Sequence, residues 1–197
     1  MALKYDPERH SRHSIRLAGY DYAHPGAYFV TICTKNRECL FGEIVEGIMR
    51  VNDAGQMIQS LWDELPQHYP GVDIDAFVVM PNHVHGIIAL TPVEAGPCTC
   101  PDNGRPRGAA PTMSLMDVVH RLKSLTTARY RHGVAEQDWR PFPGKLWQRN
   151  YYEHIIRDEN ELACIRQYII DNPMRWEMDR ENPHRQSEDE SEEWLDS

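Results

Sequence analysis

Two short apolar runs flank Pro81-Asn82-His83, and they constrain the fold of this chain more than any other feature. The runs, 73–80 and 84–90, have the length and β-branched content of strands. The proline turn predicts that they are consecutive strands, although such a turn permits other geometries. No apolar run in the 197 residues approaches the roughly 20 residues of a membrane-spanning helix. We therefore expect a soluble cytoplasmic protein with no membrane partner.

Strand and helix patterns alternate along the rest of the chain. Gly47 interrupts a weaker strand, Asn52 or Asp53 is placed to cap the first helix, and Pro173 ends the last one. The predicted strands are 27–33, 44–51, 73–80, 84–90 and 146–156, and the predicted helices are 53–68, 112–131 and one from Asp158 or Asn160 to about Asn172. This order predicts an α+β sandwich, a mainly antiparallel β-sheet with helices packed on one face.

Charge is distributed unevenly, and this distribution decides which partners are compatible with the chain. The formal net charge is −9, but residues 177–197 hold nine acidic and two basic residues. We expect this segment to be a disordered acidic tail. The remaining body is nearly neutral, so its local basic stretches leave a nucleic-acid partner open. The Pro/Gly-rich stretch 91–111 predicts a long loop, and the five cysteines show neither disulfide nor zinc spacing.

His83 and His85 form the first candidate site. Residues i and i+2 of a strand point to the same face, so the two imidazoles are expected to stand side by side and can chelate one divalent cation. A pair of ordinary surface histidines gives the same pattern. The spacing alone does not decide between these alternatives.

Tyr168 and Asn172 form the second candidate site. They are four residues apart in a predicted helix and share one face. A tyrosine hydroxyl becomes a nucleophile when a metal polarises the phosphate that it attacks, and an asparagine carboxamide can be a third ligand of that metal. A half-buried tyrosine that only packs against the core is the alternative.

Residues 146–157 combine aromatic and basic side chains in a way that suits contact with unpaired nucleotides. Tyr151, Tyr152 and His154 are competing candidates for a nucleophile or a ligand. Arg149 and Arg157 are candidates for phosphate contacts. The alternative is an edge strand whose aromatic residues belong to the core.

Taken together, five segments of the chain resemble the REP-associated tyrosine transposases, relatives of the insertion-sequence 200-like single-tyrosine transposases of the HUH class. The resemblance spans about 14–176, which defines the expected catalytic domain after a flexible lead of residues 1–13. The segments begin with Ser14-Ile-Arg-Leu-Ala-Gly-Tyr-Asp-Tyr22 and Tyr28-Phe-Val-Thr-Ile-Cys33, and continue with Val78-Val-Met-Pro-Asn-His-Val-His-Gly86, residues 146–157 and Tyr168-Ile-Ile-Asp-Asn-Pro173.

The resemblance implies a ferredoxin-like core, the HUH nuclease fold, with His83 and His85 on a central strand. It implies that Tyr168 is the nucleophile and that Asn172 completes an Mg²⁺ or Mn²⁺ site. Such proteins cut single-stranded DNA beside palindromic hairpins, become joined to the 5′ phosphate and rejoin the strand. His154, with Tyr151 and Tyr152, is then expected to be a neighbour of the active site, and the oligomeric state, monomer or homodimer, stays open.

The expected function is therefore that of a metal-dependent transposase and single-strand endonuclease, associated with the nucleoid when bound to DNA. The residues expected to contact DNA are Arg121, Lys123, Arg129, Arg149, Arg157, Arg12 and Arg16. Two alternatives remain. One is a non-catalytic, domesticated DNA-hairpin-binding protein, and the other is a metallohydrolase that uses water in place of Tyr168.

Overall fold

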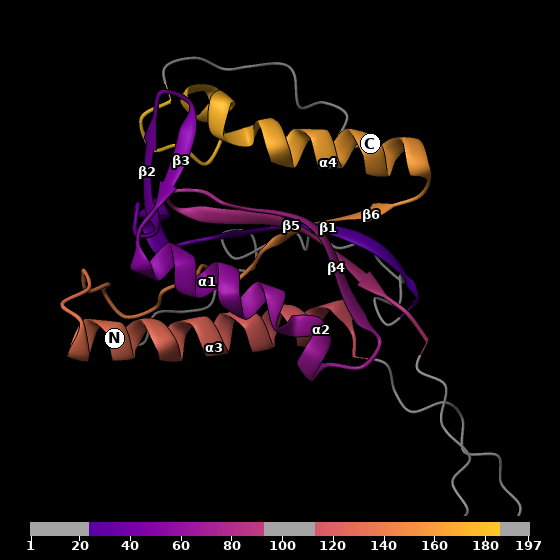
Figure 1. Ribbon diagram of the computed structural model, residues 1–197, viewed down its shortest axis with the longest axis horizontal. Coiled ribbons are helices and arrows are strands. Elements are labelled where there is room, and N and C mark those ends of the chain that lie inside the picture. Colours follow the sequence, from indigo (N-terminus) through magenta and orange to yellow (C-terminus); the bar gives the residue numbers. More distant parts are fainter. Residues whose placement is uncertain (1–23, 93–112, 186–197) are drawn as a thin grey trace, which may run out of the picture.

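The computed structural model describes residues 24–92 and 113–185, which form an α+β sandwich (Figure 1). Its central sheet has four strands in the order β4-β5-β1-β6, and each neighbouring pair is antiparallel. The strands are β1 (Gly26–Cys33), β4 (Val72–Val79), β5 (His83–Leu90) and β6 (Tyr152–Ile156). This topology confirms the expected ferredoxin-like fold class.

The helices lie on both faces of this sheet, which corrects the expectation of one covered face. Figure 1 shows α1 (Asp53–Asp63), α2 (Leu65–His68) and α3 (Leu115–Glu136) below the sheet and α4 (Glu159–Asp171) above it. Helix periodicity reveals that a helix has an apolar stripe but not which sheet face the stripe meets. No helix of the described residues is long and apolar enough to cross a membrane.

Residues 44–51 form a hairpin where one interrupted strand was predicted. Strands β2 (Gly42–Val45) and β3 (Ile48–Val51) pair with each other in a separate two-stranded sheet. Glu46 and Gly47 join them with φ angles of 52° and 73°. Two consecutive residues with positive φ are typical of the tight turn that matches the twist of a hairpin.

Each long helix begins at a polar cap. Asn52 accepts a hydrogen bond from the Gly55 N–H, and Asp158 accepts two at the start of α4, so one of the two candidates predicted for each helix is confirmed. Ser114 and Asp117 form a reciprocal capping box, so α3 begins later than the predicted residue 112. After α4 the chain continues as a 3₁₀ helix, η2 (Asn172–Met178), because Pro173 cannot donate the next backbone hydrogen bond.

Two further boundaries differ from those predicted. Within the predicted strand 146–156, residues 152–156 form β6, and Trp147 makes a single isolated bridge with Thr34. Between them, the carbonyl oxygens of Gln148 and Asn150 accept hydrogen bonds from Lys123. The start of the expected disordered tail also differs, since residues 177–185 are described and Asp179 and Asn182 in them are buried. The expected lead 1–13, most of the loop 91–111 and residues 186–197 lie outside the described residues.

Candidate metal and tyrosine site

His83 and His85 lie next to each other in the interior of the protein, on the face of the sheet that α4 covers. They occupy β5, a central strand, and their side chains are 0% and 3% exposed. The two Nε2 atoms are 2.9 Å apart. The i, i+2 spacing thus places both imidazoles on one face, and their burial excludes a pair of ordinary surface histidines.

Asn82 fixes the proton position on His83. The Asn82 amide nitrogen donates to the carbonyl oxygens of Arg37 and Glu181, at 3.1 and 2.7 Å. The Asn82 Oδ1 therefore faces Nδ1 of His83 at 2.8 Å and must accept a hydrogen bond from it. This leaves the lone pair of His83 on Nε2, the atom that faces His85.

Thr31 supports His85 in a similar way. Its hydroxyl lies 2.8 Å from Nδ1 of His85, and both side chains are buried. Burial lowers the pKa of His83 to about 3, with a smaller contribution from the charge of Arg37, and lowers the pKa of His85 well below its usual value. Both imidazoles are therefore neutral at pH 7, the form in which histidine binds metals.

Asp179 joins the two histidines, although the sequence analysis assigned it to the acidic tail. One carboxylate oxygen of Asp179 and one ring nitrogen from each histidine all lie within 4.8 Å of one another. Asp179 Oδ2 is 3.5 Å from His83 Nε2. The group is wholly buried and has a composition that can bind a divalent metal ion. No motif in the sequence distinguishes Asp179 from its acidic neighbours, so only the fold reveals it.

Tyr168 reaches this group from α4. Its ring is half-buried and lies against His85, with ring centroids 5.3 Å apart, and against Phe29 at 5.9 Å. Ile165 and Ile169, on the same helix, are buried against the sheet. The structure therefore brings together Tyr168, His83 and His85 from segments that lie more than 80 residues apart in the sequence.

Asn172 lies one helical turn beyond Tyr168, at the junction of α4 and η2. Its side chain is 2% exposed, and its Oδ1 has no hydrogen-bond partner among the described residues. A buried amide oxygen without a partner is costly, and a ligand or cation is one way to satisfy it. This observation is compatible with the role predicted for Asn172.

The aromatic segment 151–154 divides between the two faces of the sheet. Tyr152 contacts Phe29 on the α4 side, and His154 forms a 2.6 Å contact with Glu161 at the start of α4. Tyr151 instead belongs to the larger core, which lies on the other side of the sheet. Of the three candidate neighbours, Tyr151 is thus separated from the histidines by the sheet.

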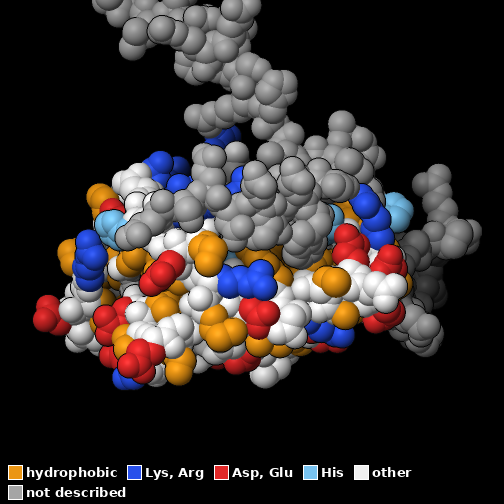
Figure 2. All heavy atoms as spheres, turned by 90° about the horizontal axis from the view of Figure 1, so that it is seen from above, with side chains coloured by type: hydrophobic (Ala, Val, Ile, Leu, Met, Phe, Trp, Pro, Cys, Tyr) orange, Lys and Arg blue, Asp and Glu red, His pale blue; other side chains and the backbone are white. Residues whose placement is uncertain are grey.

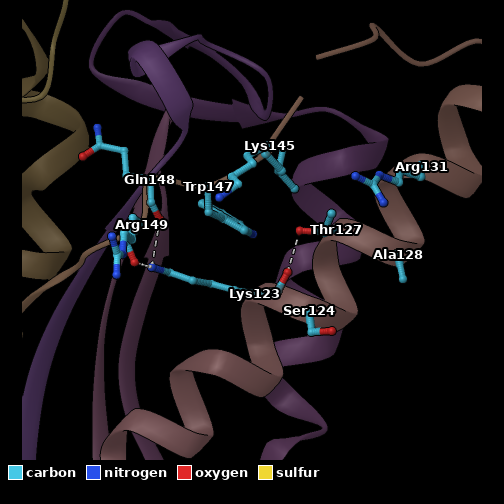
Figure 3. Close-up of a pocket in the computed structure, with 10 residues that line it drawn as sticks. Lys123, Ser124, Thr127, Ala128, Arg131, Lys145, Trp147, Gln148 and Arg149 are labelled. Atoms are coloured by element: carbon cyan, nitrogen blue, oxygen red, sulfur yellow. Dashed lines mark hydrogen bonds between the residues drawn. The ribbon is translucent and has the colours of Figure 1, made fainter. Parts of the chain in front are cut away.

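A basic pocket lies between α3 and residues 145–149, with a cavity volume of about 400 Å³. Figure 3 shows Arg131 from α3 and Lys145, Trp147 and Arg149 from the opposite segment around it. Among the residues predicted to contact DNA, Lys123 and Arg149 line this pocket. Arg131 and Lys145 were not among those predicted residues, although both are basic and exposed.

Lys123 has a structural role at this pocket. Its ammonium donates to the carbonyl oxygen of Gln148 at 3.2 Å (Figure 3). It also donates to the Asn150 carbonyl oxygen at 3.1 Å and lies over the Tyr151 ring. Of the other predicted contacts, Arg121, Arg129 and Arg157 are exposed, whereas Arg12 and Arg16 lie outside the described residues. On the α4 face, Lys and Arg side chains are interspersed with Asp and Glu side chains over the visible described surface (Figure 2).

Comparison with known proteins places this geometry in context. Residues 108–172 match the family described as "Transposase IS200 like", a range that includes Tyr168 and Asn172. An uncharacterized protein of Haemophilus influenzae is 42% identical over 185 residues, which cover 91% of this chain and 98% of that protein.

Two named relatives are more distant. A putative REP-associated tyrosine transposase of Haemophilus influenzae is 24% identical and covers 79% of this chain and 74% of its own length. The ISDra2 transposase TnpA of Deinococcus radiodurans is 26% identical and covers 77% of this chain and 86% of its own length.

The fold also occurs among solved structures. One of them is a REP-associated tyrosine transposase bound to a REP hairpin, which matches with a TM-score of 0.51 at 20% identity, over 81% of this chain and 74% of that one. The family match, the named relatives and the shared fold agree with one another. Residues 108–172 thus resemble the IS200-like transposases, and over most of its length the chain is similar to a putative REP-associated tyrosine transposase.

Proposed function

We propose that this protein cuts and rejoins single-stranded DNA at palindromic repeat hairpins, and that Tyr168 becomes joined to the 5′ phosphate. The observation that carries the proposal is the contact of the Tyr168 ring with the ring of His85, whose centroids are 5.3 Å apart. His85 itself belongs to the buried group of His83, His85 and Asp179. A tyrosine that only packs against the core needs no such neighbours. The family and the hairpin-bound structural relative support DNA as the substrate.

His83, His85 and Asn172 are proposed to hold one Mg²⁺ or Mn²⁺ ion. The residues fit such an ion, because both imidazoles are neutral and Asn172 Oδ1 is buried without a partner among the described residues. When bound, the ion polarises the scissile phosphate and offsets the charge that develops on its oxygens. Histidine nitrogen suits Mn²⁺ at least as well as Mg²⁺, which prefers oxygen.

Tyr168 supplies the nucleophile. Its phenolic oxygen forms a bond to phosphorus as the bond to the 3′ oxygen breaks, the phenol loses its proton, and the 3′ oxygen leaves as a hydroxyl. The phosphotyrosine ester retains the energy of the phosphodiester. A 3′ hydroxyl can therefore attack it, restore a DNA strand and release the tyrosine without ATP.

We propose that the basic pocket also binds DNA, although α3, which lines it, covers the opposite face of the sheet from α4. The Gln148 N–H donates to the Cys33 carbonyl oxygen, and Cys33 pairs with His83 in the sheet, so the pocket and the histidines lie at the same end of β1 and β5. We expect Arg149 to contact a backbone phosphate. Lys123, in contrast, supports the segment that carries Arg149, because its ammonium already binds carbonyl oxygens.

The proposal is tested with a palindromic single-stranded oligonucleotide and Mn²⁺. Wild-type protein should form a covalent adduct that survives denaturing electrophoresis, and Tyr168→Phe should form none while it still binds the oligonucleotide. Tight binding without an adduct, on every palindrome from the flanks of the encoding gene, would instead identify a hairpin-binding protein. Cleavage that persists in Tyr168→Phe would identify water as the nucleophile.

The DNA contacts are tested through the salt dependence of binding. Arg149→Ala should reduce the slope of log affinity against log salt by about 1, the value expected for one lost phosphate contact. Lys123→Ala should weaken binding through displacement of residues 148–150. An unchanged slope in Arg149→Ala would remove that residue from the DNA path.

A further inference from the structure

The segment that follows α4 turns back over the histidine pair. Trp176 of η2 stacks on His83, with ring centroids 6.1 Å apart. Three residues later, Asp179 is 5% exposed. The Asn182 amide nitrogen donates to the Trp176 carbonyl oxygen at 2.8 Å and closes the turn. Residues 172–182 are therefore an ordered part of the site.

Asn82 ties this segment to the histidines. Its amide nitrogen donates to the Glu181 carbonyl oxygen at 2.7 Å, while its Oδ1 accepts from Nδ1 of His83. Glu181 is also paired with Arg37, Nε to Oε2, at 2.9 Å. A single asparagine thus fixes both the ring of His83 and the backbone two residues after Asp179.

Two of the atoms that meet at the centre, His83 Nε2 and Asp179 Oδ2, need a proton or a cation between them. His83 Nε2 bears a lone pair, because Nδ1 carries the proton, and a carboxylate at Asp179 offers only lone pairs at Oδ2. These two acceptors lie 3.5 Å apart, and Oδ2 has no hydrogen-bond partner among the described residues. A carboxylate that is buried in this way needs a proton or a positive charge beside it.

We propose that Asp179 is an anionic ligand of the cation that His83 and His85 bind, so that the segment after the tyrosine helix completes the metal centre. This inference rests on the proposed function for the presence of a metal. A carboxylate adds negative charge and a hard oxygen to two imidazoles, which strengthens binding of Mg²⁺ and Mn²⁺. Asn172, the ligand predicted from sequence, supplies a neutral oxygen by comparison.

The test is the affinity of the full-length protein for Mn²⁺ alone, measured from the electron paramagnetic resonance signal of the free ion. Asp179→Asn should weaken binding at least tenfold, a lower bound set by the effect of losing even an indirect partner of a metal ligand. The variant keeps Oδ1, which accepts from the Glu181 N–H at 2.7 Å, so the turn is preserved. Glu181→Gln is the matched control, because it removes the same charge two residues away and should change the affinity less than twofold.

The outcomes separate this inference from the proposed function. If Asp179→Asn binds Mn²⁺ as the wild type does while His85→Ala does not, Asp179 is no ligand, although the metal-dependent chemistry stands. If wild type, His83→Ala and His85→Ala all bind equally weakly, the metal site itself fails.

A second variant distinguishes ligation from a structural role. Asp179→Cys should lose affinity for Mn²⁺ but gain affinity for Cd²⁺, with an ultraviolet charge-transfer band from the new thiolate, because a soft ligand favours a soft metal. Wild type titrated with Cd²⁺ is the reference, since the chain has five cysteines of its own. The same band in both proteins would contradict ligation at position 179.

Discussion

The two faces of the central sheet differ in chemistry although the same strands build both. On the side of α1 and α3, β5 contributes Val84 and Ile88 to a large apolar core. On the side of α4, the alternate residues are His83 and His85, and the apolar cluster there has four buried members among residues 24–92 and 113–185. Side chains of a strand alternate between its two faces. In β5, therefore, one set of alternate residues packs the apolar core and the other set carries the candidate metal ligands. The first face can stabilise a second face that holds Asn172 Oδ1 and Asp179 Oδ2, which have no hydrogen-bond partner in the part of the chain that the structure describes.

Removal of a large side chain from the α1/α3 face should have the largest effect on stability. Trp62 is 0% exposed and stacks on Phe77, with centroids 4.2 Å apart. We expect Trp62→Ala to lower the free energy of unfolding by about 3–5 kcal/mol, because the cavity cannot fully collapse. Urea titration measures the change.

Tyr168→Phe is the matched change on the α4 face. It keeps the aromatic ring and should cost about 1 kcal/mol or less, while the DNA adduct disappears. Equal losses of stability in the two variants would contradict the division of roles between the faces.

Gly86 tests how closely β5 packs on the stable face. A Cβ at this position would lie 2.5 Å from Cη2 of Trp62 and 2.9 Å from Cδ2 of Phe77. Gly86→Ala should therefore cost about 1–3 kcal/mol in the free energy of unfolding. In the control Gly26→Ala the nearest atom is 3.7 Å away, in ordinary contact, so a loss as large as that of Gly86→Ala would point to backbone effects instead.

Thr31 tests the support of His85 on the other face. Thr31→Val removes the hydroxyl 2.8 Å from Nδ1 of His85 and should reduce Mn²⁺ affinity about 10–100-fold, because the tautomer and orientation of the ring are no longer fixed. The accompanying loss of stability should be about 1 kcal/mol. Thr31→Ser keeps the hydroxyl and should retain the affinity. An unchanged affinity in Thr31→Val would show that His85 is oriented without it.

The pair of Asp75 and Arg166 should have the smallest effect, and it depends on pH. It joins β4 to α4, with Arg166 Nε 2.9 Å from Asp75 Oδ1, and the hydrogen bond from Arg166 is the main reason that the Asp75 pKa is lowered from 3.8. A carboxyl whose pKa is depressed by folding stabilises the protein above its unfolded pKa, and this contribution is lost as the pH falls through the folded value. Asp75→Asn should therefore be less stable than wild type at pH 7, and the difference should vanish below the folded pKa of Asp75. Urea titrations across this range, repeated with Arg166→Gln, measure it, and a difference that persists in acid would exclude the ion pair as its cause.

Much of this arrangement could be predicted from local patterns. Alternation along 84–90 and the i, i+2 spacing of the histidines depend only on strand geometry, and Asp158 and Asn52 were identifiable as caps from their side chains. Tyr168 was singled out through helical spacing and through the family resemblance, and the structure puts it against His85. These features depend on a few neighbouring residues.

The remaining features depend on contacts between distant segments. The choice of sheet face by α4 depends on which side of the sheet remains uncovered, which no helical period encodes. Asp179 lies in a stretch of acidic composition, and two residues after it the Glu181 carbonyl oxygen accepts a hydrogen bond from Asn82, 99 positions earlier in the sequence. Lys123 has the sequence pattern of a DNA contact, but its ammonium binds carbonyl oxygens of a loop.

The alternation of side chains along β5 also determines which mutations of this strand are compatible with the fold. A one-residue insertion directly after the turn at Asn82 would exchange the two sets of side chains, so that imidazoles would meet Trp62 and valine would meet Tyr168. Both faces would then fail together, even though no individual side chain had been replaced. Length is therefore under tighter constraint than identity in this strand, and variant libraries should substitute within it but never change its number of residues.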